Sequence, residues 1–382
     1  MAMIYALGGS GVPNYGDELI AKYWLNIIRD RFPEKRMVLE CTSPSVSTLN
    51  LQPENWKASH VSFIKSIASE RAAPDFWGNV ERGYKFIHRK GFQRMVRMSG
   101  LEEAIAGAEV FHLIGGGYIN QNWPHTGFLL GFAGSLRSQF GTRVVGTGLG
   151  IMPISPPPNA HRRMFRRVLD GFEFLESRDA EGANFLVSQT GLSGVARHGL
   201  DDTFIMPARS SPNTTGARKL HISCFLQGKN LAELISCLAD RKSDIAKQFS
   251  EVVFWNCAPH RDHQAATAFR ELFPEMKELS LWELIGDFPV SSQDFMITTR
   301  FHPHLLAARA GASGYFVESG GAYYQTKHGS VLELGSPFRP ISDIGKFEFT
   351  SPPNADILNK DSSRVASKAF TIESIYGRLP PS

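Results

Sequence analysis

Apolar runs and segments with helical spacing alternate along the chain. The run 3–7 leads into a glycine-rich turn, and 17–31 then carries apolar side chains three or four residues apart, as on one face of a helix. The runs 109–114 and 143–146 also end in glycines. After residue 218 the alternation returns, and we expect strands at 220–225, 252–257, 295–298 and 315–317 and helices at 230–249 and 261–272.

Strands that alternate with helices are typical of parallel α/β sheets. The segment 207–218, PARSSPNTTGAR, has the composition of a linker. We therefore predict two Rossmann-like, doubly wound α/β domains that face a cleft, an N-terminal domain at 1–206 and a C-terminal domain at 219–342. The pattern does not place the tail, 343–382, and packing back onto the first domain is one alternative.

The composition is that of an ordinary soluble protein. The 382 residues are 42% hydrophobic and 20% charged, and the formal net charge of +4 does not by itself indicate nucleic acid. The N-terminus resembles a first strand and not a signal peptide, and no apolar run approaches the ~20 residues of a membrane span. The four cysteines form no CxxC pair and indicate buried thiols in a reducing compartment.

Basic and aromatic residues are interleaved between 82 and 97. Such a pattern occurs on proteins that bind nucleic acid or an anionic membrane surface. It also describes a solvated helix face over an aromatic strip, and we favour this interpretation because no nucleic-acid-binding module surrounds the stretch. We expect no nucleic-acid partner and at most peripheral membrane contact.

The strongest candidates for catalysis and ligand binding lie where the strand 295–298 turns into a helix. Arg300 and His302 lie in this turn, Pro303 suits the first turn of the helix, and Gly311 ends it. The crevice beyond the strand ends of an open α/β sheet binds ligands. A guanidinium can bind a carboxylate or phosphate through two hydrogen bonds, and an imidazole can move a proton near neutral pH. A structural arginine and a core histidine are the alternative.

The first glycine-rich loop nearly fits two phosphate-binding motifs and fails both. The GxGxxG motif needs a third glycine where Asn14 stands, and a Walker loop needs Lys and Ser or Thr where Asp17 and Glu18 stand. Two carboxylates would repel a triphosphate, whereas carboxylates and an amide suit the hydroxyls of a sugar. Helix capping by Asn14 and Asp17 is the alternative.

Two more glycine-rich loops follow buried strands. Gly115, Gly116 and Gly117 permit positive φ and close backbone approach, so a ligand or another backbone must come near them. The second loop is 146–150. Arg178 follows the strand expected at 172–175, and its place at the carboxyl end of a strand makes it a further binding candidate.

Five motifs together resemble the polysaccharide pyruvyl transferase family. They are NYGDE at 14–18, LIGGG at 113–117, GTGLG at 146–150, SRD at 177–179 and RFH at 300–302. The similarity spans about residues 5–335 and includes a glycine-rich loop that we expect to carry Tyr323, Tyr324 and Lys327. Two positions depart from the family pattern: Phe301 stands where Leu is usual, and Gly146-Thr147 where Gly-Gln is common.

The resemblance implies transfer of a carboxyethylidene group from phosphoenolpyruvate to two hydroxyls of one sugar, on a fold like that of GT-B glycosyltransferases. By that analogy the donor lies against the second domain and the sugar against the first. Arg300 and His302 would be the donor pair, with His302 as general acid, and Asp17 would orient or deprotonate the acceptor hydroxyls. The further donor-binding residues would be Lys327 and Arg178, and the acceptor-binding residues Asn14, Asp17, Glu18, Gly116 and Gly117. His304 is a second candidate for the acid, but we favour a packed or supporting role for it.

No cofactor and no metal site are expected, because phosphoenolpyruvate is itself the donor substrate. The partner would be a sugar or glycan acceptor, in a polysaccharide or its lipid-linked precursor. We expect a cytoplasmic protein, with a place at the inner membrane surface left open, as is the oligomeric state. Two other functions remain alternatives: a nucleotide-sugar glycosyltransferase of the GT-B type and a non-catalytic glycan-binding protein.

Overall fold

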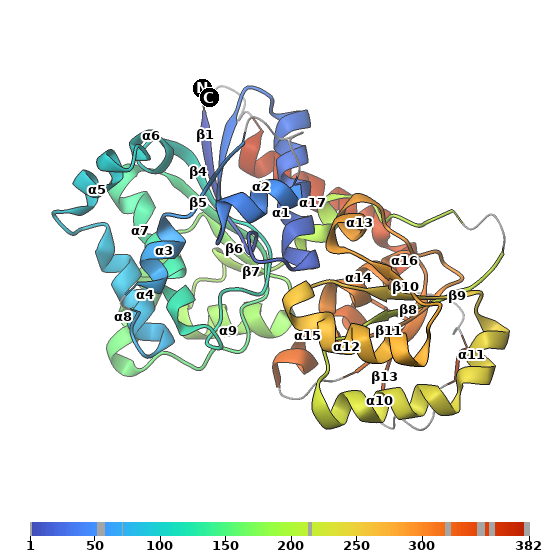
Figure 1. Ribbon diagram of the computed structural model, residues 1–382. Coiled ribbons are helices and arrows are strands. Elements are labelled where there is room, and N and C mark those ends of the chain that lie inside the picture. Colours follow the sequence, from blue (N-terminus) through green and yellow to red (C-terminus); the bar gives the residue numbers. More distant parts are fainter. Residues whose placement is uncertain are drawn as a thin grey trace. The chain divides into compact units, whose positions relative to one another are not determined.

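A computed structural model of the chain describes residues 2–51, 58–70, 72–212, 216–317, 322–341, 348–350 and 356–377. The chain divides into two compact units, each with one sheet (Figure 1). The first unit comprises 1–12, 17–205 and 366–382, and the second comprises 13–16 and 206–365. Two parallel-sheet α/β units confirm the predicted fold class, and the cleft between them stays a prediction.

The first unit has a parallel sheet of order β3-β2-β1-β4-β5-β6-β7. Its strands are β1 (Met3–Leu7), β2 (Arg36–Glu40), β3 (Ala58–Val61), β4 (Ala108–Leu113), β5 (Arg143–Leu149), β6 (Phe174–Ser177) and β7 (Ala196–His198). Its helices are α1 (Tyr15–Arg31), α2 (Pro44–Leu51), α3 (Ile64–Ser69), α4 (Phe76–Phe86), α5 (Phe92–Met98), α6 (Glu102–Ile105), α7 (Gly127–Phe140), α8 (Asn159–Asp170) and α9 (Ala180–Thr190), with 3-10 turns at Pro124–Thr126 and Asp202–Ile205.

The second unit has a parallel sheet of order β10-β9-β8-β11-β12-β13. Its strands are β8 (Lys219–Ser223), β9 (Glu251–Trp255), β10 (Lys277–Leu279), β11 (Phe295–Thr298), β12 (Ser313–Phe316) and β13 (Arg339–Pro340). Its helices are α10 (Gly228–Asp240), α11 (Lys242–Gln248), α12 (Pro259–Leu272), α13 (Leu281–Gly286), α14 (Phe301–Arg309), α15 (Ala322–Glu333) and α16 (Asp356–Asn359). The last helix, α17 (Asp361–Tyr376), contains the change from the second unit back to the first.

Each sheet has a point where the strand order reverses. In the first sheet β1 and β4 are neighbours, and the chain proceeds outward from them in opposite directions. In the second sheet β8 and β11 hold the same place. Ligands of open α/β sheets bind beyond the carboxyl ends of the strands at such a switch point. The fold therefore directs attention to the loops that follow β1 and β4, and to those that follow β8 and β11.

The basic stretch lies on the helical layer of the first unit. Helices α4, α7 and α8 pack together on one side of the sheet, and α5 follows α4 (Figure 1). Phe92 and Val96 of this stretch are buried in the core, whereas Arg94 and Arg97 are exposed. This is the solvated face over an apolar strip that we favoured from sequence. All four cysteines are free and buried, as predicted.

Three local predictions were wrong. The single helix expected at 230–249 is two helices, α10 and α11, that meet at Arg241, because between Leu238 and Ile245 only Ala239 could extend the apolar face. Strand β10 was missed, since a three-residue strand with two charged positions carries no pattern of its own. Tyr323, Tyr324 and Lys327 lie on helix α15 and not in a glycine-rich loop; residues 318–321, with the glycines before this helix, lie outside the described residues.

Candidate functional site

The turn after β11 places Arg300 and His302 at the switch point of the second sheet. Arg300 is the N-cap of α14, and its backbone N–H donates to Thr298 Oγ1 at 2.9 Å. His302 follows in the first turn of the helix, with 9% of its surface exposed. Strand β11 is buried along its whole length and pairs with β8 and β12, so the position of this turn is set by the centre of the sheet.

A buried carboxylate orients Arg300. Asp262 on α12 is fully buried, and its Oδ1 accepts from the Arg300 guanidinium, whose side chain is 11% exposed. Its other oxygen accepts from the Ala258 backbone N–H at 2.8 Å. Burial raises the pKa of Asp262, although the charge of Arg300 opposes this. We did not predict Asp262, because an acidic residue in the first turn of a helix is common and carries no further signal.

Aromatic rings bring further cations to the same edge of the sheet. The Phe225 ring, after β8, has the Arg300 and Arg261 guanidinium carbons 5.1 and 5.2 Å from its centroid. Tyr324 on α15 lies with its ring 5.5 Å from that of Phe225. Beside it, Lys327 Nζ lies 3.7 Å from the Tyr323 ring. We call Phe225, Arg261, Arg300, Tyr323, Tyr324 and Lys327 the cation–aromatic cluster.

The segment 13–16 belongs to the second unit and packs beside His302. The Tyr15 backbone N–H donates to the Cys257 carbonyl at 2.8 Å, and the Tyr15 ring meets Trp255 edge-on at 5.8 Å. Gly16 lies so close to His302 that an added Cβ would be 1.7 Å from the imidazole Nδ1. Asn14, which we predicted on the acceptor side, therefore lies in the unit that holds Arg300 and His302.

His304 is a packed residue, as expected. It is fully buried, its Nδ1 lies 2.9 Å from His328 Nδ1, and its Nε2 lies 2.8 Å from Ser336 Oγ. Burial lowers the pKa of His304 well below its ordinary value, and it lowers the pKa of His328 to about 4. The two histidines are therefore neutral near pH 7, and their contact joins α14 to α15.

At the switch point of the first sheet, Asp17 lies between two glycine-rich loops. A Cβ added to Gly9 would be 2.5 Å from Asp17 Cγ, and one added to Gly116 would be 3.0 Å from its Oδ1. Gly116 has a φ of +137°, which side-chain-bearing residues rarely adopt. Asp17 and Gly117 remain partly exposed. These residues are brought together as the sequence predicted, and their role stays a prediction.

Glu18 has a different role from the one we predicted. Its carboxylate is fully buried and accepts from Ser10 Oγ at 2.6 Å and from the Gly11 backbone N–H at 2.9 Å. Burial raises its pKa from the ordinary 4.5 to about 7, although these hydrogen bonds oppose the shift. A residue that is buried and holds its own loop cannot also contact an acceptor, so Glu18 shapes the loop.

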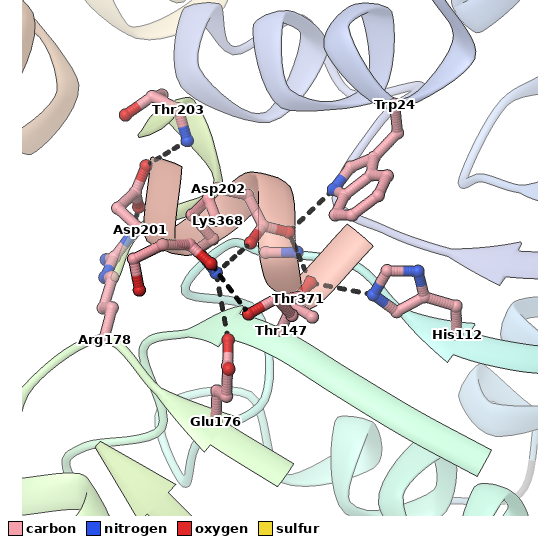
Figure 2. A network of polar contacts seen from close by, with 12 residues as sticks. Trp24, His112, Thr147, Glu176, Arg178, Asp201, Asp202, Thr203, Lys368 and Thr371 are labelled. Atoms are coloured by element: carbon pink, nitrogen blue, oxygen red, sulfur yellow. Dashed lines mark hydrogen bonds and ion pairs between the residues drawn. The ribbon is translucent and has the colours of Figure 1, made fainter. Parts of the chain in front are cut away.

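A buried polar network (Figure 2) holds the glycine-rich loop 115–117 through the backbone of Gly115. Asp202 accepts from the Gly115 backbone N–H, Trp24 Nε1 and Thr147 Oγ1 at 2.7 to 2.8 Å. Lys368 on α17 donates to Asp202 at 2.9 Å and to Glu176 at 3.0 Å. Although burial opposes it, the charges of Asp202 and Glu176 raise the pKa of Lys368. Neither Asp202 nor Lys368 was predicted.

Arg178 also lies in the first unit, near this network (Figure 2). Its Nη1 donates to Asp201 Oδ2 at 2.8 Å, and both side chains are only 2% exposed. A Cβ on Gly150 would be 2.8 Å from its Nη2. Arg178 is therefore held in a buried ion pair against the 146–150 loop of the first unit, and its role in donor binding stays a prediction.

Within the described ranges, no group of three or more His, Cys, Asp or Glu side chains is arranged to hold a metal ion. Among the same residues, no helix is long and apolar enough to cross a membrane.

Comparison with solved structures supports the fold. The UDP-GlcNAc 2-epimerase from Neisseria meningitidis bound to UDP-GlcNAc aligns at a TM-score of 0.53 with 8% identity, covering 99% of this chain and 95% of that one. The UDP-GlcNAc 2-epimerase from Methanocaldococcus jannaschii aligns at 0.51 with 10% identity, covering 97% and 100%. A glycosyltransferase from Rickettsia africae aligns at 0.48 with 9% identity, covering 98% and 91%, and this score is too low to bear on the fold. At these identities the likeness concerns the fold alone.

Comparison with families is more informative. No curated protein matches the sequence significantly. The model of the family described as polysaccharide pyruvyl transferase matches residues 14–319, most of the chain and all five of the motifs that carried the resemblance. The chain therefore belongs to the polysaccharide pyruvyl transferase family.

Proposed function

We propose that this protein transfers a carboxyethylidene group from phosphoenolpyruvate to two hydroxyls of one sugar, in a polysaccharide or its precursor. The observation that carries the proposal is the arrangement in the second unit, where His302 lies in the same turn as Arg300, and Arg300 shares the Phe225 ring with Arg261 in the cation–aromatic cluster. Family membership supports a pyruvyl transferase acting on a polysaccharide. The donor and the ketal chemistry are the proposal.

Phosphoenolpyruvate suits this arrangement by its charge. It carries a carboxylate and a phosphate on one small molecule, and guanidinium and ammonium groups bind both through charge-assisted hydrogen bonds. Arg300 is preorganised, because Asp262 holds the guanidinium in one orientation. Its Nε is buried and has no hydrogen-bond partner among the described residues, so a donor is left for a ligand oxygen. Lys327 supplies a second cation of the donor site.

The reaction begins with a proton at the CH2 carbon of the enol. We assign His302 as the general acid, because an imidazole exchanges protons near neutral pH and general acids lower such barriers. Protonation gives C2 oxocarbenium character, and the first sugar hydroxyl bonds to C2 and loses its proton. The C2–O bond to phosphate then breaks, and the second hydroxyl bonds to C2 and closes the ketal. Of the two hydroxyl protons, one restores the acid and the other leaves with phosphate.

For the acceptor we propose the surface of the first unit around Asp17, Gly116 and Gly117. A carboxylate beside a glycine-rich backbone offers acceptors and donors of hydrogen bonds for sugar hydroxyls. Asp17 would orient these hydroxyls or accept a proton from them. We leave Glu18 out of the acceptor site, because its carboxylate is fully buried in the loop that it holds. Arg178, which follows β6, stays a candidate for donor binding. Asn14, which precedes Gly16 in the second unit, stays a candidate for either substrate.

The decisive experiment measures phosphate release from phosphoenolpyruvate with a panel of aryl glycosides as acceptors. We expect acceptor-dependent release, with a mass gain of the glycoside that matches a ketal. The variant His302→Gln keeps the size of the side chain but not its titration, and we expect it to lower the rate at least about 100-fold. His263→Gln, on the exposed face of α12, is the matched control and should keep the wild-type rate.

Ligand-dependent stabilisation separates the alternatives, because only a ligand of the folded state raises the unfolding temperature. A shift with phosphoenolpyruvate and none with UDP- or GDP-sugars supports the proposal. A shift with a nucleotide sugar alone would favour a glycosyltransferase, and a shift with glycosides but no phosphate release would favour a glycan-binding protein. Full activity of His302→Gln would contradict the assigned acid.

A further inference from the structure

We propose that Arg261 is a second arginine of the donor site, which binds the phosphoryl group of phosphoenolpyruvate while Arg300 binds its carboxylate. The inference rests on the proposed function and extends it to a residue that neither the sequence motifs nor the family pattern indicated. Three observations support it: the position of Arg261, the net positive charge around Phe225, and the exposure of Arg261 to the solvent into which phosphate leaves.

Arg261 follows a different strand from the other cations of the donor site. It lies in the first turn of α12, which follows β9, whereas Arg300 follows β11 and Phe225 follows β8. The Phe225 ring holds both guanidinium groups, with their central carbons 5.2 and 5.1 Å from its centroid. Cations stacked on an aromatic face are held there by the ring quadrupole. Two arginines from the starts of two different helices thus converge on one ring.

The charges near Phe225 favour an anion. Asp262 forms an ion pair with Arg300, and it is the next residue after Arg261 on α12. Arg261 itself makes no ion pair with any residue that the structure describes. The two guanidinium groups at Phe225 therefore face one carboxylate, which leaves an excess of one positive charge. Like charges that converge repel each other unless an anion lies near, and phosphoenolpyruvate brings at least two negative charges.

The two arginines differ in burial, and this assigns the ends of the substrate. Arg300 is nearly buried and fixed by Asp262, whereas Arg261 is exposed. In the reaction the carboxylate stays on the product, but the phosphoryl group departs into solvent. The fixed cation therefore suits the carboxylate, and the exposed one suits the leaving group. The N-terminus of the 14-residue helix α12 adds a favourable field for phosphate.

The test measures, by calorimetric titration, the affinity of the wild-type protein and of three variants for three ligands. The ligands are phosphoenolpyruvate, inorganic phosphate, and pyruvate as a carboxylate without phosphate. For Arg261→Gln we expect phosphoenolpyruvate and phosphate to bind about 10- to 100-fold more weakly, the loss typical of charge-assisted hydrogen bonds, and pyruvate to bind as to wild type. Arg261→Lys keeps the charge and should recover part of the affinity.

The control is Arg270→Gln, which removes an exposed arginine from the same helix and breaks only a surface ion pair with Glu278. It should bind all three ligands as wild type does, and unfolding temperatures show that each variant folds. Unchanged phosphate affinity in Arg261→Gln, or an equal loss for pyruvate and phosphate, would overturn the role of Arg261 but not the proposed function. Wild-type protein that binds none of the three contradicts the proposed function as well.

Discussion

At the scale of single residues, burial separates two neighbouring carboxylates. Asp17 and Glu18 stand side by side in the sequence, and both begin the helix α1. Because successive residues of a helix point about 100° apart, Asp17 meets Gly9 and Gly116 at the surface while Glu18 points into the loop below. The two carboxylates therefore have different surroundings: Glu18 holds its own loop, whereas Asp17 is the one that we propose for substrate binding. The sequence places both at the helix start and cannot separate them.

Glu18 predicts a pH dependence of stability. Its pKa is about 7 in the folded chain, against an ordinary 4.5, so between these values the folded state binds a proton that the unfolded state has lost. The free energy of unfolding should therefore fall as the pH rises from 4.5 to 7 and stay level above, by up to about 3 kcal/mol. Glu18→Gln should remove this slope. Urea unfolding at pH 5, 6, 7 and 8 measures it.

The control for this prediction is Glu34→Gln, which changes an exposed carboxyl near the end of α1. It should leave the difference in unfolding free energy between pH 5 and pH 8 as in wild type. If Glu18→Gln showed the same slope as wild type, the buried carboxyl would not be the titrating group.

At the scale of elements, strands that are buried on both faces were predictable. The β11 segment is buried throughout, and β4 is buried except at Glu109, so their mainly apolar runs stand out in the sequence. Helix α15 did not stand out, because its buried positions form no apolar pattern. They are His328, Ser330 and Val331, and two of these are polar. Its histidine is accommodated by His304, a partner that no local pattern shows.

The candidate site was predictable only where it is local. Arg300 and His302 share one strand-to-helix turn, and the pattern around that turn indicated both. Asp262 is 38 positions from Arg300 along the chain, and Phe225 comes from another strand end. These residues meet because parallel strands align their carboxyl ends, and the strand order that brings them together is not readable from one sequence.

The contact between Gly16 and α14 gives a prediction at this scale. Gly16→Ala would place a methyl group where the His302 imidazole lies, 1.7 Å from Nδ1, so the ring must turn away. We expect the rate of phosphate release to fall at least about 100-fold, as for loss of the acid itself, with an overpacking cost of about 1 to 3 kcal/mol in stability. Steady-state kinetics and thermal unfolding measure the two effects.

Gly286→Ala is the matched control, because it adds the same methyl group at the end of α13, where no heavy atom beyond the neighbouring backbone lies within 4 Å. It should keep wild-type rate and stability. A Gly16→Ala enzyme with the wild-type rate would show that the orientation of His302 does not govern catalysis.

At the scale of the whole molecule, neither unit is one continuous stretch of chain. The second unit includes 13–16, and the first includes 366–382, a segment beyond the family match at 14–319. Within the first unit this segment is an integral part: Lys368 binds Asp202 and Glu176, and Tyr376 Oη lies 2.5 Å from His112 Nδ1. The family region alone thus lacks the cation beneath its own glycine-rich loop.

Lys368→Met tests this dependence. The variant fills the space of the lysine stem but leaves Asp202 and Glu176 buried without their shared cation. Breaking a buried ion pair by removing one partner costs about 3 to 5 kcal/mol, so the first unit should unfold at clearly lower urea concentration. Lys360→Met, which breaks only the exposed pair with Asp356, should cost less than about 1 kcal/mol.

Because Asp202 also accepts the Gly115 N–H, the loop at Gly115–Gly117 should exchange its amide hydrogens faster in Lys368→Met. Equal stability of the two variants, with unchanged exchange at the loop, would mean that the glycine-rich loop keeps its shape without the ion pairs of Lys368.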